Sequence, residues 1–109
     1  MSRPLGLFVL FLAAILEAGG DALVRAGLNA SSPAIRAAMF TLGAVVLFSY
    51  GYAVNRPAWD FGRLLGIYVV FFFVIAQVMS WLAFGQRPLL MTMIGGAFVV
   101  AGGVIMSIG

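Results

Sequence analysis

Long apolar runs separated by short polar breaks dominate the chain. Four such runs cover about residues 4–27, 33–55, 61–84 and 89–108. An α-helix rises 1.5 Å per residue, so about 20 apolar residues cross the hydrocarbon core of a bilayer. The pattern therefore predicts an all-α membrane protein, in which one domain of four transmembrane helices is connected by short loops.

Proline and cap residues in the polar breaks predict where these helices begin and end. Ser32 followed by Pro33 is a helix-start signal, with serine as the N-cap and proline in the first turn. Pro57 ends the second helix, and Asp60 is expected to cap the third. A tight turn over residues 85–88 separates the third helix from the fourth.

Composition supports the membrane assignment and excludes several kinds of function. The chain is 64% hydrophobic and 8% charged, with a mean hydropathy of +1.17, which a soluble domain of 109 residues could not bury. Histidine and cysteine are both absent, so metal and thiol chemistry are not expected. The dispersed arginines do not form a nucleic-acid-binding patch. We expect no cofactor, no nucleic-acid partner and no enzymatic activity.

The arginines are divided evenly between the two sides of the predicted four-helix arrangement. One side carries Arg3, Arg56 and Arg63, and the other carries Arg25, Arg36 and Arg87. The positive-inside rule then gives no preferred orientation. We interpret the balance as insertion in both orientations, which permits an antiparallel dimer. The alternative is a single orientation. In that case one or two of the arginines extend their side chains along the helix to the membrane interface and do not decide the orientation.

Glu17 lies near the middle of the first apolar run. An ionised side chain at this depth costs about 3 kcal/mol on insertion scales, so a glutamate here indicates function. Ala13 and Gly20, one turn away on either side, leave room for a ligand or for another helix. A carboxyl group in this position can exchange a proton for a cation, as a coupled antiporter requires. The alternative is a neutral glutamate that hydrogen-bonds between helices.

Asp21 and Arg25 follow Glu17 at intervals of four residues, so all three share one face of a helix. Asp21 is either a second acid of the site or the partner of Arg25 in an ion pair. The spacing favours the ion pair, because an aspartate four residues before an arginine also suits the helix dipole. Glu17 would then be the unpaired acid.

The third and second runs contribute aromatic residues. Tyr68, Phe71 and Phe72 are spaced to form one wall, which could hold an organic cation against the ring faces. The alternative is that these rings face lipid or pack against other helices. Tyr50 and Tyr52 are expected at the membrane interface.

Small residues repeat in the fourth run. Gly95 and Gly102 are seven residues apart, as are Gly96 and Gly103, and Ala101 lies beside them. Small residues on a membrane helix allow another helix to approach closely. These five residues are the predicted dimer interface.

Together, several stretches resemble the small multidrug resistance transporters, within the drug/metabolite transporter superfamily. They are AAILEAGGDALVRAG in the first run, SWLAFGQRP before the fourth and GGAFVVAGG within it. LEAGGDALVRAGL and FGRLLGIY are closer to the YnfA-like branch. The resemblance implies a dimer of four-span subunits, often antiparallel, in the inner membrane of a bacterium. It also implies that a pair of glutamates binds either protons or a small cationic substrate.

By this resemblance Glu17 matches the essential acid, Gly20 the small residue one turn below it, and Tyr68 the pocket aromatic. The predicted function is proton-coupled efflux of small cationic or amphipathic compounds by a homodimer. The chain departs from the family where a Gly-x-Gly pair normally follows the pocket aromatic, because residues 69–73 are bulky. Asp21 is a further departure.

Two other functions remain open. The missing glycines favour a non-transporting accessory subunit, or one half of a heterodimer. A component of a lipid-carrier flippase ranks third, because anionic headgroups need basic pocket residues and only Arg63 or Arg25 could serve.

Overall fold

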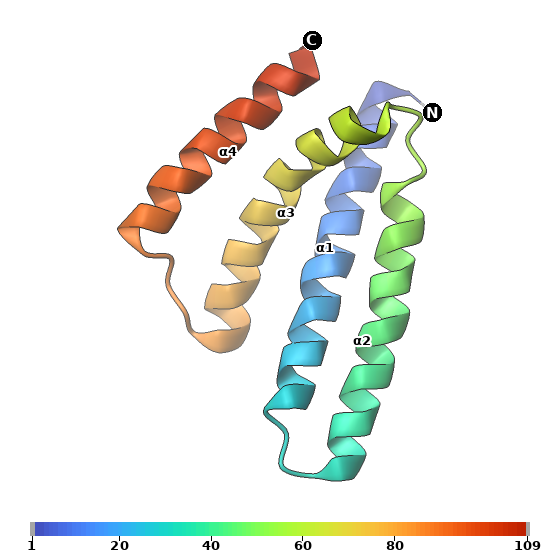
Figure 1. The fold of residues 1–109 in the computed structure, drawn as a ribbon, viewed down its shortest axis with the longest axis vertical. Coiled ribbons are helices and arrows are strands. Elements are labelled where there is room, and N and C mark those ends of the chain that lie inside the picture. The colour runs from blue at the N-terminus through green and yellow to red at the C-terminus, as the bar shows by residue number, and fades with distance from the viewer. Residues whose placement is uncertain (1, 109) are drawn as a thin grey trace.

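The computed structural model describes residues 2–108, which form four α-helices: α1 (Arg3–Leu28), α2 (Pro33–Val54), α3 (Phe61–Phe84) and α4 (Leu90–Ile108). Each helix is long and apolar enough to cross a membrane, and each lies within one residue of a predicted range. The helices run alternately up and down. The start of α1, the α2–α3 loop and the end of α4 therefore lie toward one end of the molecule (Figure 1).

Serine hydroxyls cap the first two helices. The hydroxyl of Ser32 accepts a hydrogen bond from the backbone N–H of Ile35 at 3.5 Å, which confirms the predicted start of α2. Ser2 caps α1 in the same way through Leu5. Asp60 occupies the N-cap position of α3, but its side chain makes no capping hydrogen bond. Asp60 therefore lies where the cap was predicted, but its side chain does not form the hydrogen bond of a cap.

A glycine ends α3. Gly85 has a φ of 63°, in the left-handed region that glycine adopts without a steric cost. Its N–H donates to the carbonyl of Trp81 at 3.0 Å, and the N–H of Gln86 donates to that of Ser80 at 3.1 Å. These two bonds satisfy carbonyls at the helix end and turn the chain toward α4.

Arg36 closes the loop between α1 and α2. Its Nε donates to the carbonyl oxygen of Gly27 at 3.2 Å, and its Nη2 donates to that of Ala30 at 2.9 Å. The last carbonyls of α1 have no partner within the helix, and they carry its negative dipole end. The guanidinium therefore stabilises the hairpin where α2 begins.

Glycines bring α1 and α2 into close contact along this hairpin. A Cβ atom on Gly20 would lie 2.7 Å from the side chain of Leu47, and one on Gly27 would lie 2.7 Å from Phe40. Gly43 of α2 packs in turn on Val24 of α1. The two numbers in each contact add up to 67 (20 and 47, 27 and 40, 24 and 43). The hairpin therefore has a single antiparallel register.

The buried core lies toward the end of the molecule that holds the α2–α3 loop. It combines the first half of α1, the end of α2 and the first half of α3, and its buried members are Leu10, Ala13, Ala14, Val54, Leu64, Ile67 and Tyr68. Toward the opposite end α3 diverges from α1 (Figure 1). α1 and α3 are thus closely packed on one side of mid-depth and separate on the other, whereas α1 and α2 stay in contact along the hairpin.

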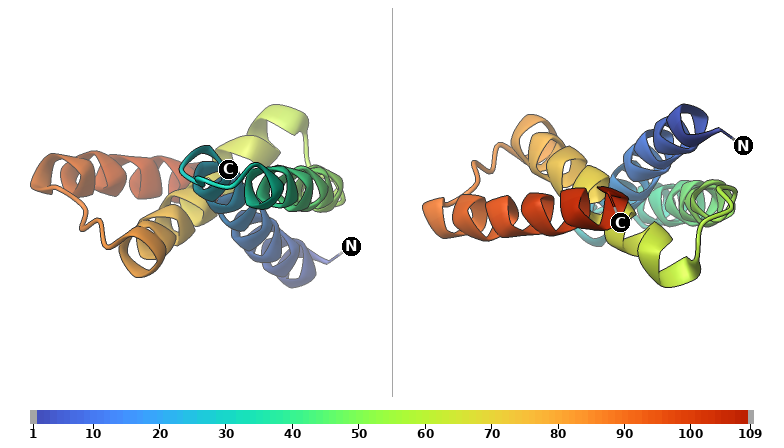
Figure 2. Two further views of the ribbon diagram at one scale, coloured as in Figure 1. Left: turned by 90° about the horizontal axis from the view of Figure 1, so that it is seen from below. Right: turned by 90° about the horizontal axis from the view of Figure 1, so that it is seen from above.

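α4 packs mainly on α3. Gly96 lies against the ring of Phe73, and Gly103 lies against Val70. Seen along the long axis, α4 meets the other helices near its carboxyl end and extends away from α1 and α2 toward its amino end (Figure 2).

Two arginines hold the carboxyl end of α4. Arg63 donates to the carbonyl oxygens of Met106 at 3.1 Å and Ser107 at 3.3 Å, and Arg3 also donates to that of Ser107. Arginine near the carboxyl end of a helix is favoured by the helix dipole. These contacts attach α4 to the starts of α1 and α3.

Candidate functional site

The carboxyl group of Glu17 receives a hydrogen bond from a tyrosine of another helix. The hydroxyl of Tyr68 donates to Glu17 Oε1 at 2.8 Å, and it lies 3.3 Å from the carbonyl oxygen of Ala13. Tyr68 is only 4% exposed. A distance of 2.8 Å is typical of a well-formed O–H···O hydrogen bond. The structure thus places three predicted site residues together.

The local sequence explains why Tyr68 reaches this position. Ala13 and Ala14 of α1 are fully buried, and their small side chains let α3 approach the backbone of α1. Ala13 and Glu17 are one helical turn apart, so their acceptor atoms face α3 together. The tyrosine hydroxyl fits between these two acceptors.

An aromatic cluster formed by Tyr50, Tyr68 and Phe72 lies beside this hydrogen bond. The ring centroids of Tyr50 and Tyr68 are 5.6 Å apart, and those of Tyr68 and Phe72 are 6.2 Å apart. Phe71 packs against the buried core. Phe72 packs against the same core and also stacks on Tyr68, so the predicted aromatic wall includes Phe72.

Tyr50 is the site residue that the sequence analysis missed, since it was expected at the membrane interface. The hairpin register contains the signal that would have found it. Residues that face each other across α1 and α2 have numbers that add up to 67, and the residue opposite Glu17 is then Tyr50.

Gly20 does not face this cluster. It is buried against Leu47 of α2, where it allows the two backbones to come together. The small size of Gly20 therefore serves the packing of α1 on α2.

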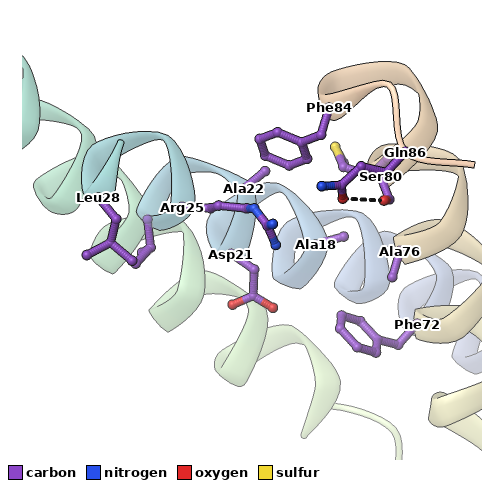
Figure 3. A pocket seen from close by; sticks show the side chains of 12 residues that line it. Ala18, Asp21, Ala22, Arg25, Leu28, Phe72, Ala76, Ser80, Phe84 and Gln86 are labelled. Atoms are coloured by element: carbon purple, nitrogen blue, oxygen red, sulfur yellow. Dashed lines mark hydrogen bonds between the residues drawn. The ribbon is translucent and has the colours of Figure 1, made fainter. Parts of the chain in front are cut away.

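A groove of about 400 Å³ continues from this cluster along α1 and α3. Asp21 and Phe72 face each other across it (Figure 3). Phe72 also stacks on Tyr68, so the groove begins beside the hydrogen-bonded pair and extends toward the ends of the two helices. The residues that line it are Ala18, Asp21, Ala22, Val24, Arg25, Leu28, Phe72, Ala76, Met79, Ser80, Phe84 and Gln86.

The predicted ion pair between Asp21 and Arg25 is not formed. The guanidinium carbon of Arg25 lies 5.2 Å from the centre of the Phe84 ring, a cation–π contact with α3. No hydrogen bond joins Asp21 to any of the other side chains drawn in Figure 3. The prediction was wrong because it considered only one helix, and α3 offers Arg25 another partner.

The glycines of α4 do not all share one environment. Gly96 and Gly103 contact α3 within the chain, whereas a Cβ atom on Gly95 or Gly102 would have nothing within 4 Å. Ala101 is exposed as well. Within one chain, the unoccupied part of the predicted dimer interface therefore consists of Gly95, Ala101 and Gly102.

The chemistry available at the site is that of one carboxyl group with a hydrogen-bond donor and aromatic rings around it. Glu17 can hold a proton or face a cation. Within residues 2–108, no group of three or more aspartate, glutamate, histidine or cysteine side chains is placed to hold a metal ion.

Comparison of the chain with models of protein families, with curated proteins and with solved structures finds no match. The resemblance to the small multidrug resistance transporters stays a prediction from sequence.

Proposed function

We propose that this protein exports small cationic or amphipathic compounds across the inner membrane of a bacterium in exchange for protons. The observation that carries the proposal is the hydrogen bond from Tyr68 to Glu17, next to an open groove between α1 and α3. A carboxyl group at the depth of a membrane core is costly and needs a reason to be there. Reversible binding of a proton or a cation is such a reason.

Exchange follows if the proton and the cation compete for Glu17. An ionised Glu17 accepts the hydrogen bond of Tyr68 and attracts a cation, whose charge the rings of Tyr50 and Phe72 also favour. Protonation removes the negative charge and releases the cation. Because the carboxyl group serves one of the two at a time, movement of either ion drives movement of the other.

We further propose that two copies of the chain form the working unit, as the resemblance to small multidrug resistance transporters implies. The side of α4 that carries Gly95 and Gly102 supports a second copy, because nothing in the chain packs on these two glycines and small residues permit close helix contact. The even division of the arginines supports an antiparallel arrangement.

Proton movement in proteoliposomes tests this function. With a pH-sensitive dye inside the vesicles, an imposed gradient of benzyltrimethylammonium should drive protons in the opposite direction through the wild-type protein. Glu17→Gln should abolish this movement, since an amide cannot exchange a proton. Asp60→Asn is the control and should retain it, because Asp60 lies in the α2–α3 loop, outside the site. Movement that persists in Glu17→Gln would contradict the proposal.

A further inference from the structure

The groove between α1 and α3 holds one acid and one base that do not bind each other. Asp21 and Arg25 both line it, four residues apart on the same face of α1. Their positions on the helix differ by about 6 Å along its axis. Arg25 is close to the end of α1, so the base lies at the outer end of the groove and the acid lies deeper.

The walls of the groove also differ between its two ends, in a way that matches the two charges. Asp21 faces the ring of Phe72, which is suited to a quaternary or alkylated ammonium group (Figure 3). Around Arg25 the groove is lined by Ser80 and Gln86. The Ser80 hydroxyl donates to Gln86 Oε1 at 3.1 Å, which leaves the amide N–H₂ of Gln86 as a donor on the side of Arg25 (Figure 3).

Arg25 remains able to bind an anion although it lies over Phe84. A guanidinium group can stack on a ring through its face and donate hydrogen bonds through its edge at the same time. A simple cation in this groove would be repelled by Arg25, and a simple anion would be repelled by Asp21. A compound with both charges would be attracted at each end.

We propose that this groove selects zwitterionic organic compounds, whose cationic group binds at Asp21 and whose anionic group binds at Arg25. This rests on the proposed function, because the groove then leads the compound's cationic end toward Glu17, one turn deeper on α1. It narrows the substrate class from small cations to compounds with a carboxylate or similar anion about 6 Å from the ammonium group.

Calorimetric binding to the purified full-length protein in lipid nanodiscs tests the proposal. The probes are 4-(trimethylammonio)butanoate, which is a zwitterion, and its methyl ester, which is a cation of nearly the same shape. The wild-type protein should bind the zwitterion about tenfold more tightly, which is the discrimination that one charge-assisted hydrogen bond supplies. Equal affinity for the two probes, tighter binding of the ester, or no binding of either would overturn the proposal.

Three variants test whether the preference depends on the charge of Arg25. Arg25→Gln should remove the preference for the zwitterion, and Arg25→Lys should retain most of it. Arg87→Gln is the matched control, because Arg87 lies over the Trp81 ring at 5.6 Å on the same side of the molecule and does not line the groove. Its preference should be that of the wild type. A preference that survives in Arg25→Gln would contradict the assignment.

Failure of this inference can be distinguished from failure of the proposed function. If protons move with benzyltrimethylammonium in a Glu17-dependent way while the zwitterion is not preferred in the binding experiment, only the groove inference falls. If the zwitterion is preferred through Arg25 but no proton movement depends on Glu17, the exchange mechanism falls and the binding site stands.

Discussion

Tyr68 connects α3 to the carboxyl group of Glu17 through a single hydroxyl. Replacing it with phenylalanine keeps the buried ring and removes the hydrogen bond of 2.8 Å. A hydrogen bond to a charged group contributes about 1.5–3 kcal/mol, so its loss changes an equilibrium or a rate about tenfold or more. We expect Tyr68→Phe to lower Glu17-dependent proton movement in proteoliposomes by at least about tenfold.

Tyr50→Phe is the control for this prediction. Tyr50 contributes its ring to the aromatic cluster at 5.6 Å from that of Tyr68, and the carboxyl group receives its hydrogen bond from Tyr68. Tyr50→Phe should therefore transport at close to the wild-type rate. Equal losses in both variants would mean that the hydroxyl of Tyr68 has no special role at Glu17.

The sequence alone was enough to predict Glu17 and Tyr68. Glu17 is an acid within an apolar run, and Tyr68 is an aromatic residue that matches a family pattern. For Asp21 the sequence favoured an ion pair with Arg25 over a second acid of the site, because the partner that Arg25 finds, Phe84, is nearly sixty residues away. It missed Tyr50 because an aromatic in a membrane helix has several possible surroundings. Only the pairing of α1 with α2 distinguishes them.

At the scale of helices, the packing of α1 on α2 depends on which side of α1 each glycine occupies. Gly19 and Gly20 are adjacent, yet a Cβ atom on Gly19 would have nothing within 4 Å, whereas one on Gly20 would lie 2.7 Å from Leu47. We expect Gly20→Ala to destabilise the fold by about 1–3 kcal/mol through overpacking. Circular dichroism during titration with a denaturing detergent would measure this.

Gly19→Ala separates packing from helix propensity. Alanine is favoured over glycine within a helix by about 1 kcal/mol, and this gain is shared by both variants. Gly19→Ala should therefore be as stable as the wild type or slightly more so. If Gly20→Ala proved equally stable, the close contact between α1 and α2 would not be present in the protein.

The bounds of the helices could be predicted well because they depend on local signals. The Ser32–Pro33 pair and the glycine at position 85 each act within one turn of chain. How the helices pack could not be read in the same way. Gly96 and Gly103 belong to a seven-residue repeat in the sequence, but the structure turns them toward Phe73 and Val70 of the same chain.

At the scale of the whole molecule, the open face of α4 predicts how two copies meet. Gly95→Leu and Gly102→Leu place a large side chain on this face, where a second helix is expected to approach. Each should lower the dimer fraction while leaving the fold of the single chain unchanged. Counting photobleaching steps of labelled protein in dilute vesicles measures the fraction.

Ala97→Leu is the matched control for the side of α4 that carries Gly95 and Gly102, since Ala97 lies instead on the side of Ala101, one turn away. Ala97 is exposed and lies two residues from Gly95, so it points to a different side of α4. The same gain in size there should leave the dimer fraction unchanged. An equal loss in Ala97→Leu, or no loss in the two glycine variants, would place the interface on another surface.

The division of the arginines predicts the response of the whole molecule to loss of one charge. Arg56 lies over the Tyr52 ring at 5.5 Å and Arg87 over the Trp81 ring at 5.6 Å, in loops at opposite ends of the helices, so the two are closely matched. Removing either one leaves three arginines against two, and the side with three should then face the cytoplasm more often. Arg56→Gln and Arg87→Gln should therefore shift the orientation in opposite directions from a wild type in which both orientations occur.

Labelling of an introduced cysteine measures the orientation. The chain has no cysteine, so a single cysteine that replaces Ser31 or Ala58 reports the exposed side through a membrane-impermeant thiol reagent. Shifts in the same direction, or a wild type that is labelled from one side only, would contradict insertion in both orientations and with it the antiparallel dimer.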